Sequence, residues 1–146
     1  MADWNKRFID LAKHIAEWSK DKSTKVGAVI ATKDNVIVSI GYNGFARGLD
    51  DNKPERHERP AKYMFTEHAE SNAILNATRT GATLKGCTIY LPWFTCSSCA
   101  RAIIQVGIDT IVCKKPDISD PRWGEHFKIA LEMFQETGVK IIYHED

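Results

Sequence analysis

Apolar residues recur along this chain at two spacings, and the change from one to the other marks the expected elements. The first segment of the chain has apolar residues spaced three and four positions apart. Such patterns, together with their stop signals, predict helices over about residues 3–20, 67–79, 96–106 and 124–137. Short β-rich runs predict strands over about residues 26–31, 36–40, 87–91, 110–113 and 139–143. Gly81, Gly107 and Gly138 each follow a predicted helix, as helix-ending glycines do.

The order of these elements predicts the architecture. The first two strands are separated by a short polar turn and form a hairpin, and from the third strand onward the order is β-α-β-α-β. Such alternation favours parallel strands joined by right-handed crossovers. We therefore expect one domain over residues 1–146, an α/β/α three-layer sandwich whose five-stranded mixed sheet has parallel C-terminal strands. A polar loop of about 23 residues after Asn43 is long enough to indicate a functional or disordered segment.

Composition limits the classes of partner that the chain is expected to bind. The chain has 146 residues, which suits a single domain, and its 20 Lys and Arg against 19 acidic residues give a net charge of +1. This balance argues against a nucleic-acid partner, which normally requires a basic stripe, but it allows a mononucleotide. No apolar run approaches the roughly 20 residues that span a bilayer, and no signal peptide is evident. We therefore expect no membrane contact and a cytoplasmic location.

Two short motifs carry the candidate chemistry. His68 and Glu70 stand at the start of the second predicted helix, and Cys96 and Cys99 at the start of the third. Helix N-termini favour thiolates, and two cysteines with one histidine form the three-ligand set typical of catalytic zinc, which leaves one position for water. Glu70 is close to this set without needing to ligate, so we expect it to act as general acid and base for that water.

The cysteines allow other interpretations. A structural zinc site would need a fourth ligand, and Cys87 and Cys113 are the candidates, but each lies within an apolar strand and is expected to pack in the core. A redox pair of Cys96 and Cys99 would leave His68 and Glu70 without a role. A non-catalytic zinc protein would make Glu70 dispensable and give the metal four protein ligands.

The motifs also resemble a known family. His-Ala-Glu followed by Cys-x-x-Cys is similar to the zinc nucleobase deaminases. Further blocks resemble deoxycytidylate deaminases in family order; they start at Ser23, Gly41, His68, Gly86 and Cys99. The resemblance implies a cytidine-deaminase-like fold and hydrolytic deamination of deoxycytidylate, with one Zn²⁺ held by His68, Cys96 and Cys99. Glu70 would shuttle the protons.

The same resemblance suggests residues for substrate binding. Lys25, Ala69 and Phe94 lie in or beside matching blocks, and Asn43 in its Gly-Tyr-Asn-Gly block is a candidate for bonding the sugar, although it could also simply form a tight turn. Arg47 and Arg79 are candidates for phosphate contacts, and Arg79 could instead serve a subunit contact. The family normally has proline before the first cysteine, where this chain has Thr95.

Regulation and assembly follow only from the resemblance. It implies a homo-oligomer, a dimer or hexamer, regulated by dCTP or dTTP with Mg²⁺. The substrate itself stays open at this stage. The same zinc chemistry could act on RNA adenosine, free cytidine, guanine or a pterin-like ring, although the near-neutral charge supplies no basic groove for RNA.

Overall fold

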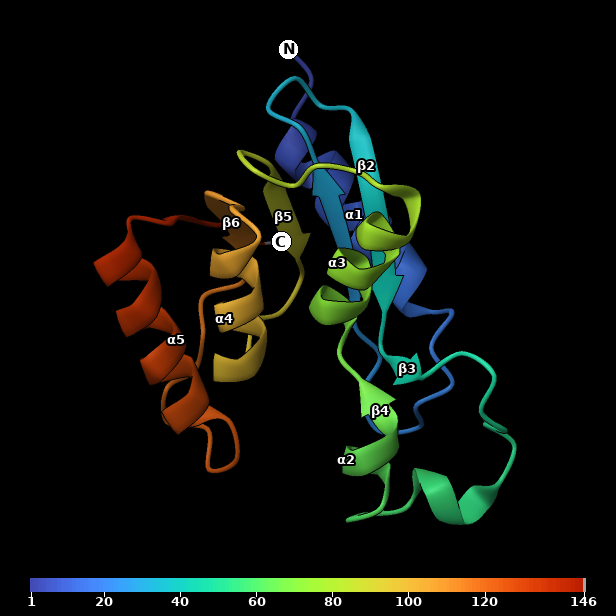
Figure 1. Ribbon diagram of the computed structural model, residues 1–146. Coiled ribbons are helices and arrows are strands. Elements are labelled where there is room, and N and C mark those ends of the chain that lie inside the picture. The colour runs from blue at the N-terminus through green and yellow to red at the C-terminus, as the bar shows by residue number, and fades with distance from the viewer. Residues whose placement is uncertain (146) are drawn as a thin grey trace.

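The computed structural model describes residues 1–145 and contains one central five-stranded sheet (Figure 1). Its strand order is β2-β1-β5-β6-β7. The strands are β1 (Gly27–Ala31), β2 (Ile37–Tyr42), β5 (Thr88–Leu91), β6 (Thr110–Cys113) and β7 (Lys140–Tyr143). β1 pairs antiparallel with β2 and β5, whereas β5, β6 and β7 run parallel. The predicted mixed sheet with parallel C-terminal strands is confirmed.

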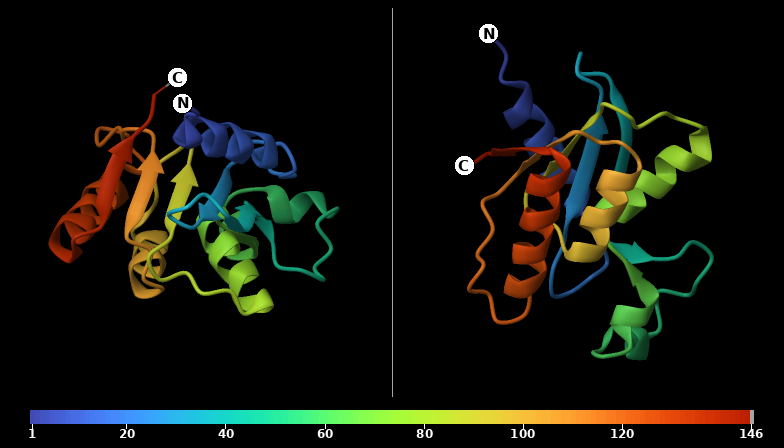
Figure 2. Two further views of the ribbon diagram at one scale, coloured as in Figure 1. Left: turned by 90° about the horizontal axis from the view of Figure 1, so that it is seen from above. Right: turned by 60° about the vertical axis from the view of Figure 1, so that its left-hand side comes forward.

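Helices cover both faces of the sheet, as Figure 2 shows from above. They are α1 (Trp4–Ala16), α3 (Ala69–Thr80), α4 (Ser97–Gln105) and α5 (Gly124–Thr137). Helix α1 lies alone on one face and packs on β1, with Phe8 and Ile9 against Val29 and Tyr90. Helices α3, α4 and α5 lie side by side on the other face. The α/β/α sandwich is therefore confirmed.

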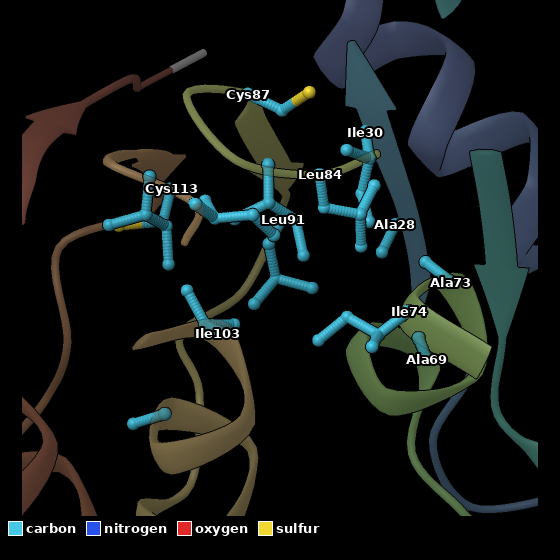
Figure 3. Packing of buried hydrophobic residues seen from close by; sticks show 14 of the residues in the cluster. Ala28, Ile30, Ala69, Ala73, Ile74, Leu84, Cys87, Leu91, Ile103 and Cys113 are labelled. Carbon is cyan, nitrogen blue, oxygen red and sulfur yellow. The ribbon is translucent and has the colours of Figure 1, made fainter. Parts of the chain in front are cut away.

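The larger core lies beneath α3 and α4. Figure 3 shows side chains of β1, α3 and α4 gathered there, including Ile30, Ile74 and Ile103. Cys87 and Cys113 are buried in this core and unpaired. Their predicted packing role is confirmed, and neither belongs to the described metal-binding cluster.

Helix α3 lies unusually close to the edge strand β2. Gly41 makes this possible, because a Cβ at that position would lie 2.3 Å from the backbone nitrogen of Ala73 and 2.5 Å from the carbonyl oxygen of Ala69. Polar side chains then tie the two elements together: Asn76 Nδ2 donates to the Ile40 carbonyl at 2.8 Å and Asn72 Nδ2 to that of Tyr42 at 2.8 Å. The start of α3 is therefore held in place by the sheet.

Two segments differ from the predicted pattern. The first helix was expected to reach residue 20 but ends at Ala16, because the chain turns where buried Ser19 donates to the Asn43 carbonyl at 2.7 Å. The expected long loop contains ordered elements: β3 (Gly44–Phe45), the 3₁₀ turn η1 (Pro54–His57), α2 (Lys62–Phe65) and β4 (Thr66–Glu67). β3 and β4 pair with each other, a contact across 20 residues that no local pattern indicates. Among residues 1–145, no helix is long and apolar enough to cross a bilayer.

Candidate active site

The three candidate metal ligands come from the starts of two neighbouring helices. His68 is the N-cap of α3, Cys96 is the N-cap of α4, and Cys99 lies in the first turn of α4. The two helices pack together on the sheet, and β5 and β6 end at the same edge at which both helices begin (Figure 1). Ligand sites in open α/β sheets form at such carboxyl edges.

The three ligand atoms converge. His68 Nδ1 lies 3.4 Å from the Sγ atoms of both Cys96 and Cys99, and all three atoms lie within 4.8 Å of one another. Zinc binds nitrogen at about 2.0–2.1 Å and sulfur at about 2.3 Å, so this spacing fits one ion. Nδ1 is the ring nitrogen that faces both thiols and would be the ligand. Within residues 1–145, this cluster holds three ligands, which matches the catalytic pattern with one position for water.

The cluster's charges also suit a cation. The pKa of the Cys96 thiol is lowered to about 4, by a hydrogen bond with Cys99 and by the neighbouring His68. In turn, contact with Cys96 raises the pKa of His68 to about 9. The pKa of Cys99 is raised because it shares its proton with Cys96 and is buried. A zinc ion would replace these protons and bind both sulfurs as thiolates.

Glu70 lies in the first turn of α3, only 4% exposed. Burial raises the pKa of its carboxyl. This effect outweighs three that lower the pKa: a hydrogen bond from the Glu70 backbone N–H, the positive charge of His68 and a hydrogen bond from Thr95. A buried carboxyl with a raised pKa beside a candidate metal site is suited to general acid–base work. Thr95 stands in the position of the family proline and is fully buried, so the departure from the family pattern places a hydroxyl next to the candidate base.

Contacts around the ligands were not expected from the sequence. The Ser71 hydroxyl lies 3.2 Å from Cys99 Sγ. The ring of Trp123, just before α5, stands edge-on to the His68 ring with centroids 6.0 Å apart. His126 Nδ1 lies 2.9 Å from the Ser97 hydroxyl beside Cys96. A signal for Ser71 existed, since it follows Glu70 on the same helix; nothing local links Trp123 to a histidine 55 residues earlier.

Several proposed substrate residues lie elsewhere. Phe94 is 2% exposed and packs edge-on against Phe127, at 5.5 Å, and Phe134, at 6.2 Å. It is a core residue between β5 and α5. Arg79 lies in the last turn of α3, three turns from the His68 end. It is not brought to the zinc ligands of its own chain.

The remaining candidates have separate surroundings. Asn43 Oδ1 accepts from the Val26 N–H at 2.9 Å and its Nδ2 donates to the Thr24 carbonyl at 2.9 Å, so most of its amide is engaged by the backbone. It lines a cleft with Trp18, Lys20 and Tyr42 that includes none of the zinc ligands.

Arg47 donates to Asn76 Oδ1 at 2.7 Å on the flank of α3, whereas Lys25 is exposed. Ala69, fully buried, directly follows His68 and contributes one of the first backbone N–H groups of α3, which lack intrahelical partners. Of the expected substrate residues, Ala69 is therefore the one that the structure places directly beside the ligands.

Comparison with known proteins decides the family. Residues 2–115 match the model of the cytidine and deoxycytidylate deaminase zinc-binding region. The chain belongs to this family. A deaminase encoded in the luxG 3′ region of Aliivibrio fischeri is 44% identical over 98% of this chain and 95% of its own length. The deoxycytidylate deaminase of Mus musculus is 36% identical over 94% of this chain and 77% of its own length.

Solved structures share the fold of this family member. The dCMP deaminase from cyanophage S-TIM5, in complex with dCMP and dUMP, matches with a TM-score of 0.77 at 21% identity and covers 95% of both chains. A structure from a study of tRNA deaminases acting at the wobble position also matches, with a TM-score of 0.61 at 20% identity over 97% of this chain. The fold is therefore shared by deaminases of different substrates and does not by itself select one.

Proposed function

We propose that this family member catalyses the zinc-dependent hydrolytic deamination of deoxycytidylate, producing deoxyuridylate and ammonia. The observation that carries the proposal is the convergence of His68, Cys96 and Cys99 beside buried Glu70. The substrate is supported by relatives from mouse and orangutan, 36% and 38% identical over nearly the whole chain, that are deoxycytidylate deaminases.

The residues divide the reaction between them. His68, Cys96 and Cys99 would hold Zn²⁺, which when bound supplies a Lewis acid for a water molecule. Glu70 would take a proton from the attacking water as the water oxygen bonds to C4 of the cytosine ring, and would pass that proton to N3. Glu70 then transfers the second water proton to the amino group, which leaves as ammonia. The raised pKa of the buried Glu70 carboxyl suits both directions of transfer.

Turnover tests the proposal. Ammonia release and ultraviolet change are measured with zinc-loaded protein and deoxycytidylate, cytidylate, deoxycytidine or deoxycytidine triphosphate. We expect rapid deamination of deoxycytidylate and its loss when a chelator removes zinc. Inactivity on all four compounds, with and without a triphosphate effector, would refute the substrate assignment, and other amino-bearing rings would then be tested.

Regulation, assembly and location are also part of the proposal. We place a dCTP or dTTP effector with Mg²⁺ in the cleft at Asn43, whose lining includes the rings of Trp18 and Tyr42 and the charged groups Lys20, Asp21 and Asp51. We expect a homo-oligomer, a dimer or a hexamer. Sedimentation of the zinc form, with and without effector, would measure its size. A cytoplasmic location agrees with four unpaired cysteines, because that compartment keeps thiols reduced.

A further inference from the structure

Trp123, the N-cap residue of α5, is held in place by its own segment of the chain. Its backbone N–H donates to Asp120 Oδ1 at 2.9 Å, and the Gly124 N–H donates to the Asp120 carbonyl at 2.9 Å. Gly124 also permits a close approach, because a Cβ at that position would lie 2.3 Å from the Ile118 carbonyl oxygen. The segment before α5 is therefore folded against the start of the helix, which restricts the directions open to the Trp123 side chain.

The same turn of α5 contacts both helices that carry the candidate zinc ligands. The half-buried Trp123 ring stands edge-on to the His68 ring at the start of α3, with centroids 6.0 Å apart and planes at 77°. Three residues later, His126 Nδ1 lies 2.9 Å from the hydroxyl of Ser97, which follows Cys96 at the start of α4. The first turn of α5 thus joins the two ligand-bearing helix starts, although it contains no candidate ligand itself.

The His68 ring lacks the hydrogen bond that normally orients a metal-binding histidine. Such a histidine usually donates from its second ring nitrogen to a carboxylate, a backbone carbonyl or water, and this bond sets the direction of the ring. His68 Nδ1 faces the sulfurs of Cys96 and Cys99, whereas Nε2 forms no hydrogen bond with any residue of the described range 1–145. His68 also precedes the first helical residue of α3 and has an extended backbone. The contact with Trp123 therefore remains to restrain the ring.

We propose that Trp123 is a positioning residue for the zinc site, whose ring holds the His68 imidazole in the orientation that directs Nδ1 at Cys96 and Cys99. An edge-to-face contact favours one orientation, because the positive edge of one ring meets the negative face of the other. A ring that is already oriented loses less freedom when it binds a metal ion. This inference rests on the part of the proposed function that makes His68 a zinc ligand.

Zinc affinity tests the assignment without any substrate. Chelator competition is measured for wild type, W123L and W123F, because leucine keeps apolar bulk without a ring and phenylalanine keeps a ring. W123L should weaken zinc binding by about 10- to 100-fold, the range for residues that orient metal ligands, and W123F should recover most of this loss. The matched control is W4L, which removes an exposed tryptophan from α1 on the opposite face of the sheet (Figure 2). W4L should bind zinc as wild type does.

A spectrum distinguishes orientation of the ligand from general packing. Cobalt(II) in place of zinc absorbs visible light in bands that depend on the arrangement of its ligands. These bands should change in W123L and should match those of wild type in W123F and W4L. Equal zinc affinity and equal bands in W123L and W123F would show that apolar bulk at this position suffices, and would overturn the assignment.

Further comparisons separate this inference from the proposed reaction. H68A removes the ligand itself and should lose more zinc affinity than W123L. Zinc loss in H68A with wild-type affinity in W123L would refute the role of Trp123 alone, whereas wild-type affinity in H68A would refute the zinc assignment as well. A raised KM for deoxycytidylate in W123L with unchanged zinc affinity would show that the ring contacts the substrate, and would overturn a positioning role. Weakened zinc binding by W123L in a protein that does not deaminate deoxycytidylate would support the role of Trp123 and refute the proposed substrate.

Discussion

At the scale of single residues, the zinc site combines groups whose charges depend on one another. Two thiolate sulfurs within 4.8 Å of each other would repel, and the protons shared between Cys96, Cys99 and His68 relieve this until a cation replaces them. Glu70 is close but buried. Its role is therefore separable from ligation, and so is the role of side chains that contact the ligands.

Replacing Glu70 tests that separation. E70Q keeps the shape of the side chain but cannot accept a proton, so kcat should fall by about 10²- to 10⁴-fold. Zinc content, measured by metal analysis, should equal that of wild type, since Glu70 is not a ligand. The control E136Q alters an exposed carboxyl on α5 and should leave kcat unchanged. Wild-type turnover by E70Q would show that the base is another group.

Ser71 allows a second test at this scale. Its hydroxyl, 3.2 Å from Cys99 Sγ, can donate to the thiolate and hold it in place. Partners of metal ligands typically contribute about 10- to 100-fold to metal affinity, so S71A should weaken zinc binding by that factor in competition with a chelator. S71T, which keeps the hydroxyl, should restore affinity. S98A removes an exposed hydroxyl next to Cys99 and should bind zinc as wild type does. If S71A also bound zinc as tightly as wild type, a contribution of the Ser71 hydroxyl would be excluded.

At the scale of elements, the site depends on how closely α3 packs against β2. Both His68 and Glu70 are fixed to the start of α3, and the position of that helix is set by the glycine at residue 41 and by the bonds of Asn72 and Asn76 to the strand. The zinc ligands of α4 are not on this helix. A shift of α3 would therefore separate the histidine from the two cysteines.

Substituting Gly41 should produce such a shift. The Cβ of G41A would lie 2.3 Å from the Ala73 nitrogen, which forces α3 away from β2. Overpacking of this kind costs about 1–3 kcal/mol in the free energy of unfolding, and zinc affinity should fall as well. Denaturant unfolding and chelator competition would measure the two effects. G44A is the control, since its Cβ would meet nothing nearer than 3.9 Å. A G41A protein with the same stability and zinc affinity as G44A would contradict the close packing of α3 on β2.

At the scale of the whole molecule, the segment between α1 and β1 is joined to the long connection that precedes α3. Lys62 in α2 bonds to Asp21 at 3.3 Å, and both side chains are nearly inaccessible, at 9% and 12% exposed. Burial alone raises the pKa of the Asp21 carboxyl, but hydrogen bonds from the Thr24 and Ser23 N–H groups and from Lys62 outweigh it, so the pKa lies below its usual 3.8. Parts of the chain 41 residues apart are thus linked by one carboxylate.

The sign of this shift gives a prediction for stability against pH. Because the folded pKa of Asp21 lies below the unfolded one, its contribution is present above about pH 4 and is lost as pH falls through the folded pKa. D21N should therefore be less stable than wild type at pH 7, by about 1 kcal/mol, and the difference should shrink below about pH 4. Urea unfolding at both pH values measures it. D34N, at the exposed β1–β2 turn, is the control; a D21N deficit as large at pH 3 as at pH 7 would contradict the linkage.

The sequence by itself determined the elements of the sheet and the helices that cover it, and it predicted the three candidate zinc ligands and Glu70. Apolar spacing and helix-end signals are local, and a three-ligand set with an adjacent acid has few chemical uses, so these features can be predicted without a structure. Only the tertiary structure showed that Phe94 is a core residue, that Arg79 lies far from the zinc ligands, and that β3 pairs with β4.

The contacts that define the rest of the site join residues far apart in the chain. Trp123 reaches His68, and Arg122 reaches Tyr63, only because α5 begins at the same edge of the sheet as α3 and α4. Local periodicity carries no information about such a meeting, since the free energy of these contacts is gained only after the sheet and its crossovers have formed. Short motifs thus indicate the chemistry of the reaction, whereas packing between distant parts of the chain sets which residues surround the site.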